Sequence, residues 1–401
     1  MFRGPQSVAE YIREQIGEDI DAQISRVCGE NGLADYLRHQ LNREILASGP
    51  PKKGTDLIKL DGYGDSLAVA DRLISGLTRL PHKLRIISPL PPAMSTIMFK
   101  NLDDVELGNG VRIMRGDILK ESSALSTGSE VLDSRVVRLT GISNYPLTPN
   151  NHFFVSWHSG FAGNFYGNYS VLDHLDRLRA FSGCWLALRI LEDDFVDNEV
   201  TQSGILVHDV TDGPVGPLVL TSRTDSDIST FYENFDLGGD YQIYDFGDDD
   251  EEVDDNGELS VDKVQQRDKV LELTKIAFGS DDHNRRLFTS CLWWFRASTS
   301  SRPMDQILYS TISLEVLLGD RETADRIGLT KLLANRCAYL LGESRSERDK
   351  MMEQFKEIYD IRSQIVHAGL HQTGREVDKA STRSRELAAR VIRKELTLAK
   401  Q

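Results

Sequence analysis

The sequence predicts an α+β module at the N-terminus followed by an all-α helical bundle at the C-terminus. Strand-like alternation of apolar and polar residues occurs up to about residue 222, and helical periodicity dominates from about Val261 onward. A strongly acidic segment separates the two patterns. The chain has 401 residues, more than one typical domain. We therefore expect a module over residues 1–244, an acidic linker over 245–262 and a helical domain over 263–401.

Helices and strands are mixed in the first module. A capping-box pattern at Ser7 and Glu10 opens a helical region that continues to about Leu46. Asn109-Gly110 is a strong hairpin signal between alternating apolar residues. The order of the strands in the sheet does not follow from these patterns. Further helices are expected over 66–80 and 171–191, and strands over 83–90, 105–114, 152–160, 203–210 and 216–222.

The acidic segment dominates the net charge of −15. Residues 224–262 contain fifteen Asp and Glu and no Lys or Arg, and the rest of the chain balances 47 acidic against 47 basic residues. The overall charge therefore does not exclude a nucleic-acid partner. The best calcium-loop register, from Glu252, places Lys263 where a bidentate glutamate is required. The segment is thus interpreted as a solvated linker, and no metal site is predicted.

We expect that residues 245–258 can be shortened without unfolding either part of the protein. Like charges at this density oppose burial, and changes in loop length cost little free energy. Thermal unfolding of the deletion variant should stay cooperative, with a midpoint near that of the wild type. Loss of the cooperative transition would show that the segment is packed.

The remaining composition indicates a cytosolic protein without cofactors. No apolar run is long enough for a membrane helix, and the N-terminus lacks the apolar core of a secretory signal. The cysteines Cys28, Cys184, Cys291 and Cys337 lack metal-ligand or redox spacing, so they are expected to be buried, reduced thiols. His152 and His158 are interpreted as structural, because no third ligand is near them in sequence.

Six helices are predicted in the C-terminal domain. Gly319, Gly342 and Gly369 stand just after three of them, where helices prefer to end. Short connections between periodic segments favour a helical bundle. The predicted helices cover residues 262–278, 283–300, 304–319, 329–342, 346–369 and 384–400.

An arginine interrupts the apolar face of the helix that ends near Gly369. On a helical wheel, Arg362 lies in the middle of the stripe formed by Phe355, Ile358 and Ile365. A guanidinium in such a position needs a partner or a cleft, because it does not lose its proton. Glu315, inside the apolar pattern "ISLEVLLG", is the obvious internal partner. A buried structural pair of Arg362 with Glu315 would be a sufficient explanation by itself.

His367 suggests chemistry instead. It is expected in the last turn of its helix, where the helix dipole favours the protonated imidazole. Ser363 is one turn earlier and can orient the ring, and Asp360 lies on the same face. A proton-transferring histidine beside a permanent cation suits cleavage of a phosphodiester. In RNA the 2′-hydroxyl supplies the nucleophile, so such a site needs no metal.

Arg362-Ser-Gln-Ile-Val-His367 resembles the R-x4-6-H motif of HEPN domains. The flanking "STISLEVLLG", "KLLANRCAYLLG" and "IYDIRSQIVHAG" are similar to the ApeA-like branch of prokaryotic defence proteins, over about residues 263–401. The resemblance implies an all-helical domain that dimerises about the motif helix, so that both copies of Arg362 and His367 line one cleft. It also implies a metal-independent ribonuclease, or an interaction module where activity has been lost.

Together these observations predict a homodimeric endoribonuclease of a defence or stress-response system. His367 would be the general acid or base, Arg362 would stabilise the transition state, Ser363 would orient His367, and Glu315 would position Arg362. The N-terminal module would respond to a trigger that the sequence does not identify. Two alternatives stay open: an inactive dimerisation or RNA-binding module, and an antitoxin-like partner. Basic residues near the C-terminus form either a solvated face or contacts to RNA phosphates; they are Arg383, Arg385, Arg390, Arg393 and Lys394.

Overall fold

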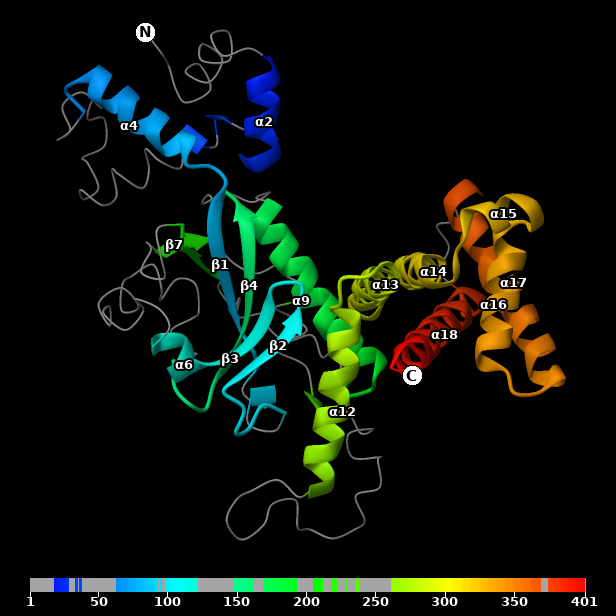
Figure 1. Ribbon diagram of the computed structural model, residues 1–401. Helices are drawn as coiled ribbons and strands as arrows, with labels where there is room; N and C mark the ends of the chain where they lie inside the picture. The colour runs from blue at the N-terminus through cyan, green and yellow to red at the C-terminus, as the bar shows by residue number, and fades with distance from the viewer. Residues whose placement is uncertain are drawn as a thin grey trace.

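A computed structural model describes most of residues 63–121, 147–192, 261–368 and 374–400. It also describes shorter pieces at 18–37, 205–211, 218–221, 228 and 236–237. In the part of the chain that is described, an antiparallel sheet and its helices precede a region of helices alone. This arrangement confirms the predicted α+β module followed by a helical region (Figure 1).

The main sheet has six antiparallel strands in the order β2-β3-β4-β1-β6-β7. The long strands β1 and β4 lie side by side at its centre, and the predicted hairpin at Asn109-Gly110 joins β2 to β3. Two further strands, β5 (Leu191–Glu192) and β8 (Asp236–Leu237), form a separate pair that is too short to predict. The six strands are β1 (His82–Pro89), β2 (Asp104–Gly108), β3 (Val111–Arg115), β4 (His152–Gly160), β6 (Ile205–Asp209) and β7 (Leu218–Thr221).

The two faces of the sheet pack against different elements. The long helix α9 (Tyr169–Ala187) covers one face, where Leu84 and Ile86 join the largest core cluster. The short helix α6 (Gly116–Glu121) lies on the other side of the sheet (Figure 1). A smaller apolar cluster on that face includes Ile87, Leu119 and Val155.

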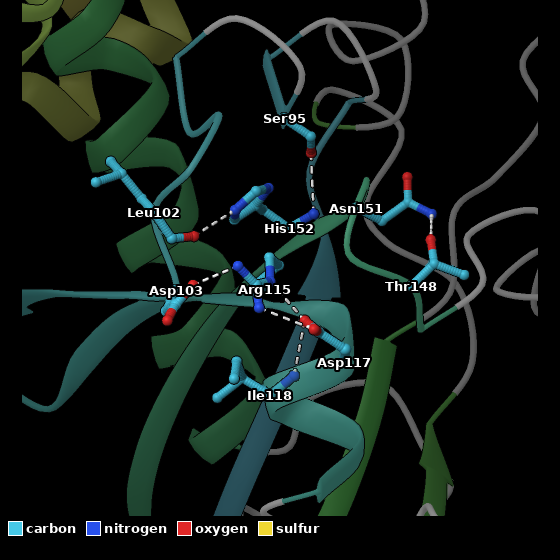
Figure 2. A network of polar contacts seen from close by, with 9 residues as sticks. All are labelled: Ser95, Leu102, Asp103, Arg115, Asp117, Ile118, Thr148, Asn151 and His152. Carbon is cyan, nitrogen blue, oxygen red and sulfur yellow. Dashed lines mark hydrogen bonds and ion pairs between the residues drawn. The ribbon is translucent and has the colours of Figure 1, made fainter. Parts of the chain in front are cut away.

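A polar network fixes the end of the sheet where β3 leads into α6 (Figure 2). Arg115 Nε donates to Asp117 at 2.6 Å, and Arg115 also pairs with Asp103. The buried His152 has Nε2 within 2.9 Å of the Leu102 carbonyl, and its backbone N–H donates to Ser95. These contacts are consistent with a structural role for His152.

Seven helices follow the module in the described residues. The long helix α17 (Arg345–Ala368) carries the Arg362 motif, and α14 (Pro303–Leu318) carries Glu315. Helix α18 begins nine residues before its predicted start. Its first turns were not predicted, because the buried Ala380 and Ser381 are small and form no obvious apolar period. Helix α15 was not predicted. The helices are α12 (Val261–Ala277), α13 (Asp282–Thr299), α14 (Pro303–Leu318), α15 (Arg321–Ile327), α16 (Leu329–Leu341), α17 (Arg345–Ala368) and α18 (Arg375–Ala399).

The helical region shares a hydrophobic core with the α+β module. Helices α9 and α13 approach so closely that a Cβ added at Gly183 would lie 2.0 Å from the carbonyl oxygen of Cys291. Gly108 has φ +118° and packs against the Phe278 carbonyl after α12, a position that tolerates only glycine. Arg393 of α18 donates to the carbonyl of Ala187 at the end of α9, at 2.7 Å. Because this core is continuous, a fragment beginning at residue 263 would expose the face of α13 that contacts α9.

The N-terminal helices α2 (Glu18–Cys28) and α4 (Ser66–Thr78) lie at the far end of the sheet from the helical region (Figure 1). Cys184, Cys291 and Cys337 are free and buried, as expected, and the side chain of Cys28 lies outside the described residues. Of the predicted acidic linker over 245–262, residues 245–260 also lie outside them, and residues 261–262 belong to α12 instead. No described helix combines the length and apolar character needed to cross a bilayer.

Candidate functional site

The last two turns of α17 leave apolar side chains incompletely covered. Earlier in the helix, Phe355, Ile358 and Tyr359 are buried in the core. Ile361 and Ile365 are only partly buried, and Val366 is 49% exposed. The apolar stripe therefore continues beyond the surface that the other described residues cover, at the same end of the helix that carries Arg362 and His367.

Arg362 is held by a glutamate and a tyrosine. Its Nη2 lies 3.2 Å from Glu315 Oε1, and the same oxygen accepts a hydrogen bond from the Tyr359 hydroxyl at 2.9 Å. The guanidinium carbon is 5.9 Å from the centre of the Tyr359 ring, within cation–π range. The pairing of Arg362 with Glu315 expected from the sequence is therefore present.

Sequence reasoning missed Tyr359 as a member of this cluster. In the sequence it looks like one more apolar residue of the core face, and its ring does stack on Phe355 with a centroid distance of 4.8 Å. Burial, and then the charge of Glu315, raise the pKa of Tyr359 well above its usual value. The hydroxyl thus stays protonated and keeps donating to the carboxylate that holds Arg362.

The end of α14 is fixed independently of this cluster. Arg286 of α13 donates to the carbonyls of Val316 and Leu317, and Arg336 of α16 donates to that of Leu318, at 2.6–2.8 Å. These bonds satisfy carbonyls that a helix end leaves without partners. Glu315, one turn before the end, therefore projects from a rigid position toward α17.

The guanidinium of Arg362 keeps capacity for another acceptor. Among the described residues, Glu315 is the one carboxylate within ion-pair distance, and Arg362 Nε has no hydrogen-bond partner. The side chain is 26% exposed, so it is neither fully buried nor freely solvated. An anion that reached Arg362 would meet a cation already oriented by Glu315 and Tyr359.

His367 lies apart from this cluster. It is exposed near the end of α17, and no described residue forms a hydrogen bond with its ring. Five residues of helix separate it from Arg362 by about 7.5 Å along the axis and about 140° around it. Ser363 and Asp360 are exposed, and the expected hydrogen bond from Ser363 to His367 is not found. One chain alone does not bring Arg362 and His367 together.

The basic residues of α18 divide between different surroundings. Arg383, Arg390 and Lys394 fall within about 40° of one another around the helix axis, whereas Arg385 and Arg393 point elsewhere. Arg383 Nη1 is 2.7 Å from Glu357 of α17. Arg383 and Arg390 also line a groove between α17 and α18, together with the apolar residues Met351, Ile358 and Leu387. The five residues thus do not form one continuous patch, and Arg393 contacts the α+β module.

A buried hydrogen-bond network of Ser156, His158 and His174 lies between β4 and α9, far from Arg362 in the sequence. Ser156 Oγ is 2.6 Å from both His158 Nε2 and His174 Nδ1, and His158 Nδ1 is 3.0 Å from Asp173. The order Ser–His–Asp resembles a hydrolase triad, but Ser156 is fully buried and shared by two imidazoles. We interpret these hydrogen bonds as a structural network of neutral histidines, in line with the structural role expected for His158.

These histidines make the stability of the fold sensitive to acid. Burial lowers the pKa of His158 and of His174, and burial followed by the charge of Arg85 lowers the pKa of His208 to about 4. The unfolded chain therefore binds these protons near pH 6.5, while the folded chain does not. The resulting stability is present above pH 6.5 and is lost as the pH falls toward 4.

We expect His208 alone to account for about 3 kcal/mol of the free energy of unfolding lost between pH 7 and pH 4. Denaturant unfolding over this range measures the loss. A His208→Gln variant, which cannot titrate, should show a shallower dependence on pH. An identical dependence in both proteins would contradict the assignment to His208.

In the described residues, no group of three or more His, Cys, Asp or Glu is arranged to hold a metal ion. Comparisons with protein-family models, with curated proteins and with solved structures give no significant match to this chain.

Proposed function

We propose that the protein is a metal-independent endoribonuclease whose active site forms when two copies meet at the ends of their α17 helices. The observation that supports this most is the position of Arg362, oriented by Glu315 and Tyr359 beside apolar side chains that the described residues leave partly exposed. The resemblance of the sequence to HEPN domains, with their dimeric R-x4-6-H sites, points the same way. Defence or stress response would be the biological setting that this resemblance implies.

The separation of Arg362 and His367 on one helix suggests how a dimer would be used. Across a two-fold axis, His367 of one subunit would lie near Arg362 of the other, and the angular separation within one helix would no longer matter. In the reaction, the 2′-oxygen attacks phosphorus and the 5′-oxygen leaves. His367 moves a proton from the attacking oxygen or to the leaving one, and Arg362 stabilises charge on the phosphoryl oxygens. The products carry a 2′,3′-cyclic phosphate and a 5′-hydroxyl.

The purified full-length protein should cleave single-stranded RNA in the presence of EDTA. Analysis of the fragment ends should show 2′,3′-cyclic phosphates, since the nucleophile belongs to the ribose. A matched substrate with a single 2′-deoxyribose at the cut site should resist cleavage there. Cleavage of both substrates at equal rates would contradict the proposed reaction.

We expect the full-length protein to be a dimer that depends on the end of α17. Val366→Asp places a charge on an apolar side chain that is 49% exposed at the proposed contact, and it should shift the protein toward monomer. Leu398→Asp is the matched control, because Leu398 is a similarly exposed apolar residue (42%) at the C-terminal end of α18, outside the proposed contact. Sedimentation velocity at micromolar concentration should show a dimer for the wild type and the control. A monomeric wild type would contradict a site shared between subunits.

An inactive dimerisation or RNA-binding module is the second candidate. The absence of a described hydrogen-bond partner for His367 favours it, because a general acid or base is usually oriented by a neighbour. Dimers that bind RNA without cleaving it, in both the wild type and the His367→Ala variant, would support this candidate.

A further inference from the structure

A buried arginine in the central strand of the sheet has no acidic partner among the described residues. Arg85 of β1 is 4% exposed, and its Nη2 lies 3.2 Å from Nδ1 of His208, its direct neighbour on β6. Arg85 Nε has no hydrogen-bond partner in the part of the chain that the structure describes. Burial lowers the pKa of Arg85, whereas the pKa of Arg115 is raised by its hydrogen bond to Asp117. A permanent cation buried without a counter-charge costs several kcal/mol.

The histidine beside it presents a second unpaired donor. Because Arg85 donates to His208 Nδ1, that nitrogen must be the acceptor of a neutral imidazole, and the proton sits on Nε2. The low pKa of His208, about 4, keeps the ring neutral. His208 is 1% exposed, and no described residue forms a hydrogen bond with its Nε2. The pair thus offers two buried N–H donors, Arg85 Nε and His208 Nε2, and one positive charge. Its one acceptor, His208 Nδ1, is already used by Arg85.

The described carboxylates near these strands are directed elsewhere. Arg85 and His208 lie on the face opposite α9, with Trp157 as the neighbour of Arg85 on β4. Asp209 follows His208 and therefore points to the α9 face, where it pairs with His82. Asp117 pairs with Arg115 beyond the His152 end of β4, roughly 17 Å along the strand from Trp157.

We propose that Arg85 and His208 form a binding site for the phosphate group of a small-molecule ligand. A phosphate supplies several oxygens in different directions, so it can accept from Arg85 and from the His208 N–H on the neighbouring strand at the same time. A planar carboxylate satisfies one guanidinium edge well but reaches a second residue less readily. Trp157, partly buried on the same face, offers an aromatic surface beside the phosphate. This site would make the α+β module a ligand-binding unit, and it does not depend on the nuclease proposal.

Thermal unfolding of the full-length protein tests the site. The probes are inorganic phosphate and AMP, with adenosine as a control without phosphate and malonate as a carboxylate control, all at matched ionic strength. The wild-type unfolding midpoint should rise by about 2–4 °C at saturating phosphate or AMP. Arg85→Met should abolish this rise, and His208→Phe should reduce it. Arg112→Met should keep it, because Arg112 lies in the same sheet but has an acidic partner, Asp104, at 3.2 Å.

Without ligand, Arg85→Met should unfold at or above the wild-type midpoint, because it removes a buried charge that no described residue neutralises. A midpoint several degrees lower would show that an acid of this chain pairs with Arg85, and would overturn the proposal. Equal responses of the wild type and Arg85→Met to phosphate and AMP would also overturn it. A rise with malonate as large as that with phosphate would overturn the assignment to phosphate. If Arg85→Met does not fold, the response of His208→Phe decides in its place.

Discussion

Replacing His367 by alanine is expected to lower the rate of RNA cleavage by roughly 10²–10⁴-fold, the contribution of a positioned proton-transfer group. The side chain is exposed and has no described hydrogen bond, so its loss should leave the fold and the dimer unchanged. Single-turnover cleavage of a labelled RNA measures the effect. Gln364→Ala, an exposed neighbour on α17, is the control and should cleave at the wild-type rate.

A folded, dimeric His367→Ala protein that cleaves RNA at the wild-type rate would contradict the proposed mechanism. Loss of cleavage together with loss of the dimer would assign His367 to assembly instead.

Arg362→Lys is expected to lower cleavage by roughly 10²–10³-fold, the usual effect of removing one donor that stabilises transition-state charge. Lysine keeps the charge and can still pair with Glu315, but it cannot donate to Glu315 and to a phosphate through one planar fork. The lysine variant should therefore unfold at nearly the wild-type temperature. The measurement is the cleavage rate of variants matched for dimer content, with Arg345→Lys, an exposed arginine at the opposite end of α17, as the control.

Arg362→Ala distinguishes this role from simple packing. It leaves Glu315 without its cation while Tyr359 still donates to it, so this variant should be less stable than Arg362→Lys. A lysine variant that cleaves as fast as the wild type would show that Arg362 serves only to pair with Glu315.

The sequence predicted the order of elements well where a local pattern determines them. The Asn109-Gly110 turn, the strands on either side and the long helices α13, α14 and α17 follow from period and turn chemistry. The sheet order does not, because it depends on pairing between segments far apart in the chain. The close packing of α9 on α13 was also missed, since a small residue such as Gly183 gives no indication in the sequence of which element packs against it.

The candidate site shows the same division. An arginine in an apolar stripe had to find a carboxylate, so Glu315 could be predicted as its partner. Tyr359 could not, because its hydroxyl distinguishes it from an ordinary core aromatic only after α14 is placed beside α17. The hydrogen bond from Ser363 to His367 was expected from spacing alone and is not found. Arg85 was overlooked because β1 reads as a buried apolar strand, and the missing counter-charge appears only when its neighbours are known.

In the proposed dimer, Arg362 of one subunit acts together with His367 of the other. Co-expression of differently tagged Arg362→Lys and His367→Ala chains, followed by purification on both tags, gives mixed dimers. Each mixed dimer holds one intact Arg362 and one intact His367 on opposite subunits. These dimers should cleave RNA at a substantial fraction of the wild-type rate, far above either variant alone. Cleavage by the mixed dimers no faster than by the two variant homodimers would contradict a site shared across the two-fold axis.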